Sequence, residues 1–123
     1  MEENELYQLR QVDFNPDTYY YEDDALRFFR TKFDNDELLY LYELAIATAK
    51  NEGYHKTKRK DYKECRIKID TAFIKFDVLG FITEDKRHRI KNGRPYILTN
   101  KGIQFYHLFK AEILKLVGVN KHV

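Results

Sequence analysis

Residues 69–102 constrain the fold of this chain more than any other stretch, and they read IDTAFIKFDVLGFITEDKRHRIKNGRPYILTNKG. Apolar residues at three- and four-residue spacing predict an amphipathic helix, which we expect to end at Gly80. A strand is predicted to open at Phe81, and Asn92-Gly93 signals a tight hairpin because both residues tolerate positive φ. Tyr96–Leu98 predict the return strand before a further helix. The order of helix, two-stranded ribbon and helix predicts a small α+β fold.

Two helices are predicted upstream of this stretch. The first spans about residues 24–33, and we expect Asp23 and Asp24 to cap it. The second, about residues 36–51, has the strongest apolar stripe of the first half, and we expect Gly53 to end it. The side chains expected to face the core are Leu26, Phe28 or Phe29, Phe33, Leu38, Leu41, Tyr42, Ala45 and Ala49, followed by Ile69, Ala72, Phe73, Phe76 and Leu79 in the later helix.

A length of 123 residues predicts one domain, which we place at residues 23–123 after an N-terminal arm of residues 1–22. The arm holds the tyrosine run Tyr19–Tyr21, which we expect to pack on the domain or on a partner subunit. A long C-terminal helix is predicted over about residues 101–117, with more apolar residues than one core-facing stripe needs. The surplus predicts a second contact surface, which a homodimer would bury.

The segment at residues 55–66 has the least defined pattern, and it reads HKTKRKDYKECR. Six of its twelve residues are Lys or Arg, and the apolar spacing of an amphipathic helix is missing. Thr57 could cap a helix here, with Tyr62 and Cys65 facing inward. The sequence leaves two alternatives open, a short or irregular helix and a basic loop.

Charge is strongly segregated along the chain, although the formal net charge is only +2. Residues 1–37 carry eleven acids and four Lys or Arg, a balance of −7. Residues 55–94 carry thirteen Lys or Arg and six acids, a balance of +7. A basic segment of this kind predicts a surface that binds a polyanion.

Several classes of protein lack support in the sequence. The acidic, polar amino terminus does not have the pattern of a secretory signal, and no apolar run approaches the ~20 residues that span a bilayer. The single cysteine cannot form an internal disulfide, and the four histidines lack the spacing of metal ligands. No phosphate-binding loop or catalytic nucleophile motif is visible. We therefore expect a cytoplasmic protein without membrane association, enzymatic activity, cofactor or metal.

The motifs LGFI and YILT, followed by Lys101-Gly102, give the chain a resemblance to known DNA-binding proteins. Over about residues 60–117 it resembles the MarR- and PadR-type winged helix-turn-helix regulators. It is also similar to small winged-helix proteins of plasmids and phages, such as the centromere-binding TubR type. The resemblance implies that the chain binds double-stranded DNA. It also implies that the helix before Gly80 enters the major groove and that the hairpin forms the wing.

Candidate DNA-binding residues follow from this resemblance and from the charge pattern. They are Lys68, Thr71 and Lys75 on the recognition helix, Arg87, Arg89, Lys91 and Arg94 on the wing, and Lys58, Arg59, Lys60, Lys63 and Arg66 in the basic segment. The helix residues would read bases, and the others would contact phosphates. The alternatives are an ordinary solvated helix face, a charged strand edge that resists aggregation, and a solvated charge run.

The function predicted from the sequence is specific binding of double-stranded DNA by a homodimer, with transcriptional regulation as the biological role. Two alternatives stay open. The first is an accessory protein that binds an origin, centromere or transfer site of a plasmid or phage. The second is a winged-helix module whose basic face meets an acidic protein.

Overall fold

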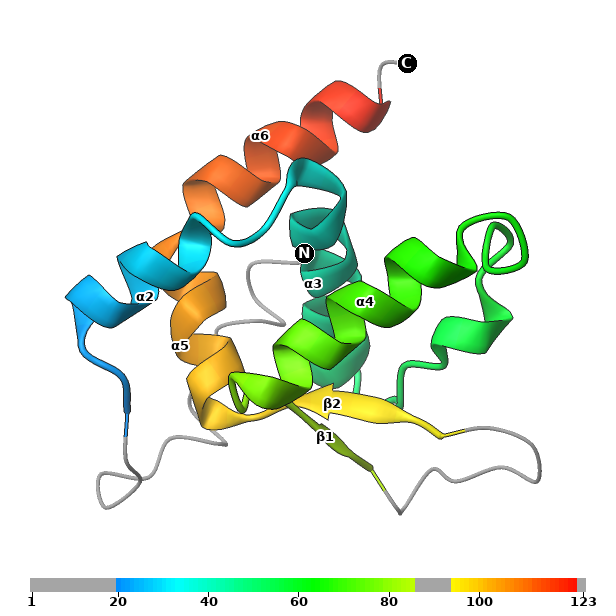
Figure 1. Ribbon diagram of the computed structural model, residues 1–123, viewed down its shortest axis with the longest axis horizontal. Coiled ribbons are helices and arrows are strands. Elements are labelled where there is room, and N and C mark those ends of the chain that lie inside the picture. The colour runs from blue at the N-terminus through cyan, green and yellow to red at the C-terminus, as the bar shows by residue number, and fades with distance from the viewer. Residues whose placement is uncertain (1–19, 86–93, 122–123) are drawn as a thin grey trace.

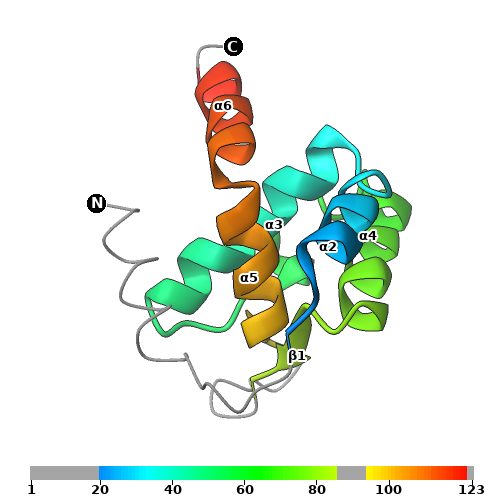
Figure 2. The same ribbon diagram turned by 90° about the vertical axis from the view of Figure 1, so that its left-hand side faces the viewer.

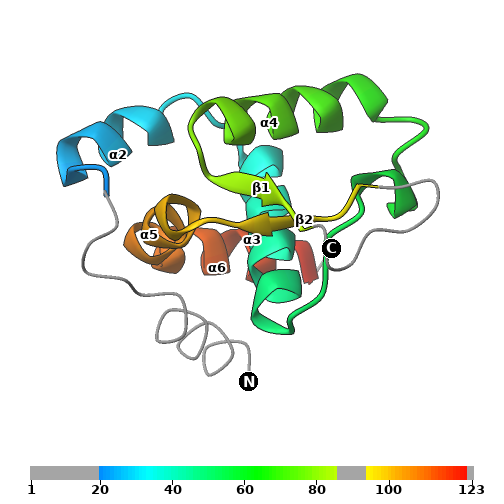
Figure 3. The same cartoon turned by 90° about the horizontal axis from the view of Figure 1, so that it is seen from below.

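The structure is a computed structural model that describes residues 20–85 and 94–121, with side chains to residue 118. Its elements are α2 (Asp23–Arg30), α3 (Asn35–Ala49), the 3₁₀ turn η1 (Lys56–Lys58), α4 (Arg66–Val78), β1 (Ile82–Glu84), β2 (Tyr96–Leu98), α5 (Asn100–Leu108) and α6 (Lys110–Lys121) (Figure 1). The predicted α+β class is confirmed. Helices α2 and α4 form one side of the molecule, with α3, α5 and the strands behind them (Figure 3). No helix in the described ranges is long and apolar enough to cross a bilayer.

Helix α3 begins at a capping box. Asp34 accepts a hydrogen bond from the Glu37 amide at 2.8 Å, and Glu37 accepts one from the Asp34 amide at 2.9 Å. The prediction that Gly53 ends this helix is wrong, because the helix stops at Ala49 and Asn51 adopts the left-handed conformation with φ of 57°. Asparagine tolerates that conformation better than most residues do, so no glycine is required there.

Helix α2 begins at Asp23, and the N-cap residue Glu22 makes no side-chain capping hydrogen bond. The predicted caps Asp23 and Asp24 lie instead in the first turn, where carboxylates favour the helix through its dipole. At its other end, Arg30 donates to Glu112 of α6 at 2.8 Å and so joins the two helices. Hydrogen bonding with Arg30 also holds the pKa of Glu112 below its usual value.

The pattern predicted for α4 is confirmed. Ile69, Ala72, Phe73 and Phe76 are buried, and Leu79 packs against the core while remaining partly exposed. The helix ends before Gly80, which has a φ of 75°. Glycine adopts that conformation at little cost because it has no Cβ. Of the earlier candidates, Leu26, Phe33, Leu38, Leu41 and Ala45 are buried, Phe29, Tyr42 and Ala49 are partly buried, and Phe28 is exposed.

Strands β1 and β2 pair antiparallel, with Ile82 opposite Leu98. The hairpin turn predicted at Asn92-Gly93 lies outside the described residues. On the other side of β2, Tyr54 and Tyr96 exchange two backbone hydrogen bonds of 2.9 Å, so a single residue acts as a third strand. Thr48 of α3 donates to Leu44 and accepts from the Leu98 amide at 3.0 Å, which fixes the strand on the helix.

The single C-terminal helix predicted over residues 101–117 is wrong, because the chain bends at Phe109 between α5 and α6 (Figure 2). The bend turns the Phe109 ring toward Phe105, at 4.9 Å between centroids, and Ile113 is fully buried. Up to residue 118, no large apolar side chain of α5 or α6 is among the exposed ones. Leu108, Phe109 and Leu116 pack against the core while remaining partly exposed, so part of the surplus apolar surface is covered within the chain, and the homodimer stays a prediction.

The arm residue Tyr21 packs on the domain. Its hydroxyl donates to the Leu79 carbonyl at 2.7 Å, and its amide donates to Gln104 at 3.1 Å. Its ring lies edge-on to Phe29 at 4.9 Å. Of the two alternatives for this tyrosine, the structure shows packing on its own subunit, whereas Tyr19 lies outside the described residues.

We expect Gly102→Ala to lower the free energy of unfolding by about 2 kcal/mol, because overpacking a tight site has a cost of that order. A Cβ at this buried position would lie 2.2 Å from the Phe81 carbonyl oxygen and 3.0 Å from Leu98. The matched control is Gly118→Ala in α6, where a Cβ meets nothing within 4 Å and a better helix former should be neutral or slightly stabilising. Urea unfolding checks both, and equal midpoints would contradict the close approach of α5 to Phe81.

Candidate nucleic-acid interface

Residues 55–65 form no α-helix. The 3₁₀ turn η1 is followed by further turns. In these, the backbone amide of Tyr62 donates to the Arg59 carbonyl at 3.2 Å, and the backbone amide of Cys65 donates to the Asp61 carbonyl at 2.9 Å. Of the two alternatives, a short or irregular helix and a basic loop, the structure shows a single 3₁₀ turn followed by irregular turns. This segment leads directly into α4, so it places its lysines at the amino-terminal end of that helix.

Arg59 holds the turn in place through three partners. It donates to Asp61 at 2.8 Å and to the Tyr54 hydroxyl at 3.0 Å, and it also pairs with Glu43 of α3. Its guanidinium lies 4.6 Å from the centre of the Tyr40 ring. Hydrogen bonding with Arg59 lowers the pKa of Asp61. With 17% of its side chain exposed, Arg59 has its donors directed into the protein, away from a phosphate.

Lys68 and Lys75, two residues expected to read bases, pair with acids of α3. Lys68 pairs with Asp36, which raises the pKa of the lysine. Lys75 lies 2.9 Å from the carboxylate of Glu37, a buried residue, and donates to the Lys32 carbonyl at 2.9 Å. These contacts position α4 on α3 and neutralise both lysines locally.

Asp70, also on α4, is neutralised in the same way. Lys56 lies 2.9 Å from its carboxylate, and the Tyr62 hydroxyl donates to it at 3.0 Å. Burial raises the pKa of Asp70, but the hydrogen bonds from Lys56 and Tyr62 outweigh it and the net shift is downward. The negative charge of Asp70 is therefore screened by its own neighbours.

The remaining candidates in the described ranges are exposed. Lys58, Lys60 and Lys63 form no ion pair with another described residue, and neither does Arg94, whereas Arg66 reaches Asp70 at 3.8 Å. The turn before α4 and the start of β2 lie on the same side of the molecule (Figure 1). Arg87, Arg89 and Lys91 lie outside the described residues.

A groove of about 270 Å³ separates α4 from the hairpin. Ile74 and Asp77 line its helix side, and Thr83 and Arg94 line its strand side. Asp77 is exposed and pairs with no described cation, and the other charged residues that line the groove are Glu84, Lys56 and Arg94.

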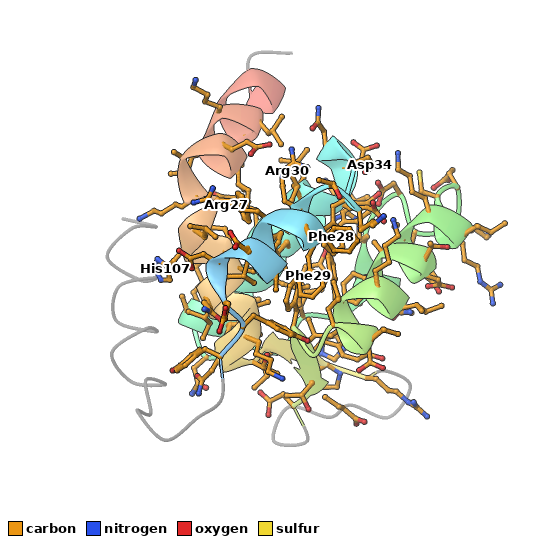
Figure 4. The ribbon with its side chains drawn as sticks, turned by 60° about the vertical axis from the view of Figure 1, so that its left-hand side comes forward. Arg27, Phe28, Phe29, Arg30, Asp34 and His107 are labelled. Atoms are coloured by element: carbon orange, nitrogen blue, oxygen red, sulfur yellow. The ribbon has the colours of Figure 1, made fainter. Side chains whose placement is uncertain are left out.

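The outer face of α4 is apolar, which the sequence analysis missed. The exposed fractions are 84% for Ile67, 63% for Ile74 and 77% for Val78, and Thr71 between them is also exposed. The sequence contained a signal for this exposed face, because Ile67, Ile74 and Val78 fall outside the apolar stripe that was predicted to face the core. The other exposed large apolar residue in the described ranges is Phe28, on the side of α2 that faces α4 (Figure 4). Arg27 and Arg30 lie on the opposite side of α2, toward α6.

Comparison of the chain with protein-family models, with curated proteins and with solved structures found no match. Within residues 20–85 and 94–121, no group of three or more His, Cys, Asp or Glu is arranged to hold a metal ion. The function is therefore argued from the geometry of α4, the turn before it and the hairpin.

We expect Arg59→Ala to lower the free energy of unfolding by about 2 kcal/mol, since it leaves Glu43, Asp61 and Tyr54 without their shared donor. The matched control is Lys58→Ala, an exposed cation next in the chain, which should change stability by less than about 0.5 kcal/mol. Urea unfolding at neutral pH measures both. If Arg59→Ala proves as stable as Lys58→Ala, then the turn does not depend on this network.

Proposed function

We propose that the chain is a winged helix-turn-helix protein that binds double-stranded DNA through α4, the turn before it and the hairpin. The order of elements supports this reading. Helix α3 is followed by the bridge at Tyr54, the turn, α4, and then β1 and β2, with Tyr54 pairing on the far side of β2 from β1. A winged helix has its first strand, recognition helix and wing in this sequence. The departure is the turn, which stands where an α-helix would begin the helix-turn-helix motif.

The observation that carries the proposal is the placement of exposed cations, all of which except Arg66 pair with no described acid. Lys58, Lys60, Lys63 and Arg66 lie at the amino-terminal end of α4, and Arg94 lies across the groove from Ile74. Duplex DNA presents one phosphate charge per ~1.7 Å of axis, so cations held on both flanks of a helix can meet the two backbones beside a groove. We assign Arg59, Lys68 and Lys75 to positioning α4, and the exposed cations to contacting phosphate.

Sequence-specific recognition would come from α4 in the major groove, and the wing residues Arg87, Arg89 and Lys91 would add phosphate contacts. A homodimer would present two copies of α4 about one DNA turn apart and favour an inverted repeat. Regulation of transcription is the role we propose first, with the origin, centromere or transfer-site role as its alternative.

A second candidate function is binding of another protein, and the apolar outer face of α4 favours it. Exposed large apolar side chains close together on a small domain are typical of interaction surfaces. Salt dependence separates the two functions. Binding to duplex DNA should fall linearly on a log–log plot against salt, with a slope set by the number of phosphates contacted.

We expect Lys63→Gln to weaken binding to a random-sequence duplex and to lower the magnitude of the salt slope by about one unit, the effect of one lost phosphate contact. The matched control is Lys115→Gln, which removes the same charge from an exposed site on α6, away from the proposed surface. Fluorescence anisotropy at about 50 to 200 mM salt measures both. If the two variants have the same slope as the parent, Lys63 does not contact DNA.

We expect Asp77→Asn to strengthen binding to the same duplex, because it removes an exposed carboxylate that borders the groove and pairs with no described cation. The gain should be largest at low salt, where screening is weakest. Asp24→Asn, an exposed acid on α2, is the matched control and should have a smaller effect. An unchanged affinity for Asp77→Asn would place the DNA away from this groove.

A further inference from the structure

The outer face of α4 carries a continuous stripe formed by Ile67, Thr71, Ile74 and Val78. Their separations of four, three and four residues keep them on one side of a helix. The core-facing residues Ile69, Ala72, Phe73 and Phe76 occupy the opposite side. Helix α4 is therefore apolar on both faces. Packing within the described domain explains the inner face but does not cover the outer one.

The long polar side chains beside this stripe are already engaged. Lys68 and Lys75 on one flank pair with Asp36 and Glu37 of α3, and Asp70 on the other flank is held by Lys56 and Tyr62. Reading guanine or adenine takes a free bidentate donor or acceptor from the helix. Lys68, Lys75 and Asp70 would have to break these pairs to provide one, whereas Asp77 and Arg66 are exposed, with Arg66 3.8 Å from Asp70. The stripe itself offers methyl groups and one hydroxyl.

We infer that α4 reads the C5-methyl groups of thymine, so that the preferred duplex is rich in A·T pairs with thymines along one wall of the major groove. This inference rests on the proposed function. The thymine methyl is the apolar feature of the major groove, and aliphatic and threonine side chains are its chemical complement. Charge complementarity supports the same occupant, because exposed Lys63 and Arg66 lie at one end of the stripe and Arg94 lies across the groove from Ile74.

The expected loss of affinity follows from the number of methyl groups that the helix buries. Burying one methyl group is worth a factor of about three to four in affinity. Two or three contacted methyl groups would therefore change the affinity by roughly tenfold to fiftyfold. An effect of this size is large enough to measure and is independent of the phosphate contacts, which do not depend on the base.

The test compares binding of the full chain to duplexes of about 30 base pairs made only of A·T pairs, with either thymidine or deoxyuridine. The two duplexes differ by the C5-methyl group, and we expect the deoxyuridine duplex to bind roughly tenfold more weakly. The double variant I67A/I74A should lose most of this discrimination while keeping the salt slope of the parent. Phe28→Ala removes an exposed apolar side chain from α2 and is the matched control, with discrimination unchanged. A G·C duplex with 5-methylcytosine, compared with cytosine, should show the same preference for the methyl group.

The outcomes separate this inference from the proposed function. Failure to bind either duplex at low salt overturns both. Salt-dependent binding with equal affinity for thymidine and deoxyuridine overturns the methyl reading and leaves DNA binding intact. Sedimentation equilibrium supplies the remaining outcome: a dimer that becomes monomeric in I67A/I74A would show that a second copy covers the stripe, and the inference would be overturned.

Discussion

The position of α4 relative to the hairpin depends on the packing of Phe81. This residue stands between the two elements, and its ring contacts Phe33 at 6.3 Å and Phe105 at 4.8 Å between centroids. Its amide donates to the Phe76 carbonyl at 2.8 Å, and its carbonyl accepts from the Thr99 amide at 2.9 Å. One buried residue thus connects the end of α4, the start of β1 and the start of α5. Ile82, the next residue along the chain, lines the groove between helix and hairpin.

Three acids of α3 are internal counter-charges for cations later in the chain. Helix α3 supplies Asp36, Glu37 and Glu43, which pair with Lys68, Lys75 and Arg59. Such pairs fix geometry more than they add stability, because the desolvation of each charge offsets much of their attraction. The charge that remains for a partner is therefore smaller than the sequence balance suggests, and it is concentrated at the turn before α4 and at the hairpin.

The different faces of α4 have different contacts. Its inner face builds the core, one flank holds the helix on α3 through Lys68 and Lys75, and its outer face is left with apolar side chains and Thr71. A helix built in this way is well positioned and has few free hydrogen-bonding groups for base edges. We therefore propose a reader of duplex DNA whose affinity comes from cations beside the helix and whose preference comes from methyl contacts on it.

The sequence by itself determined the elements whose signals are local. The apolar stripe of α4, the left-handed Gly80 and the strand at Tyr96–Leu98 all follow from spacing and from residues with special backbone preferences. Tertiary structure alone decided the break at Phe109, the bridge at Tyr54 and the pairing of the charged residues. The physical reason is separation along the chain. Lys68 and Asp36 are 32 residues apart and Lys75 and Glu37 are 38 apart, so no local pattern shows that a cation has a partner until the helices that carry both are packed together.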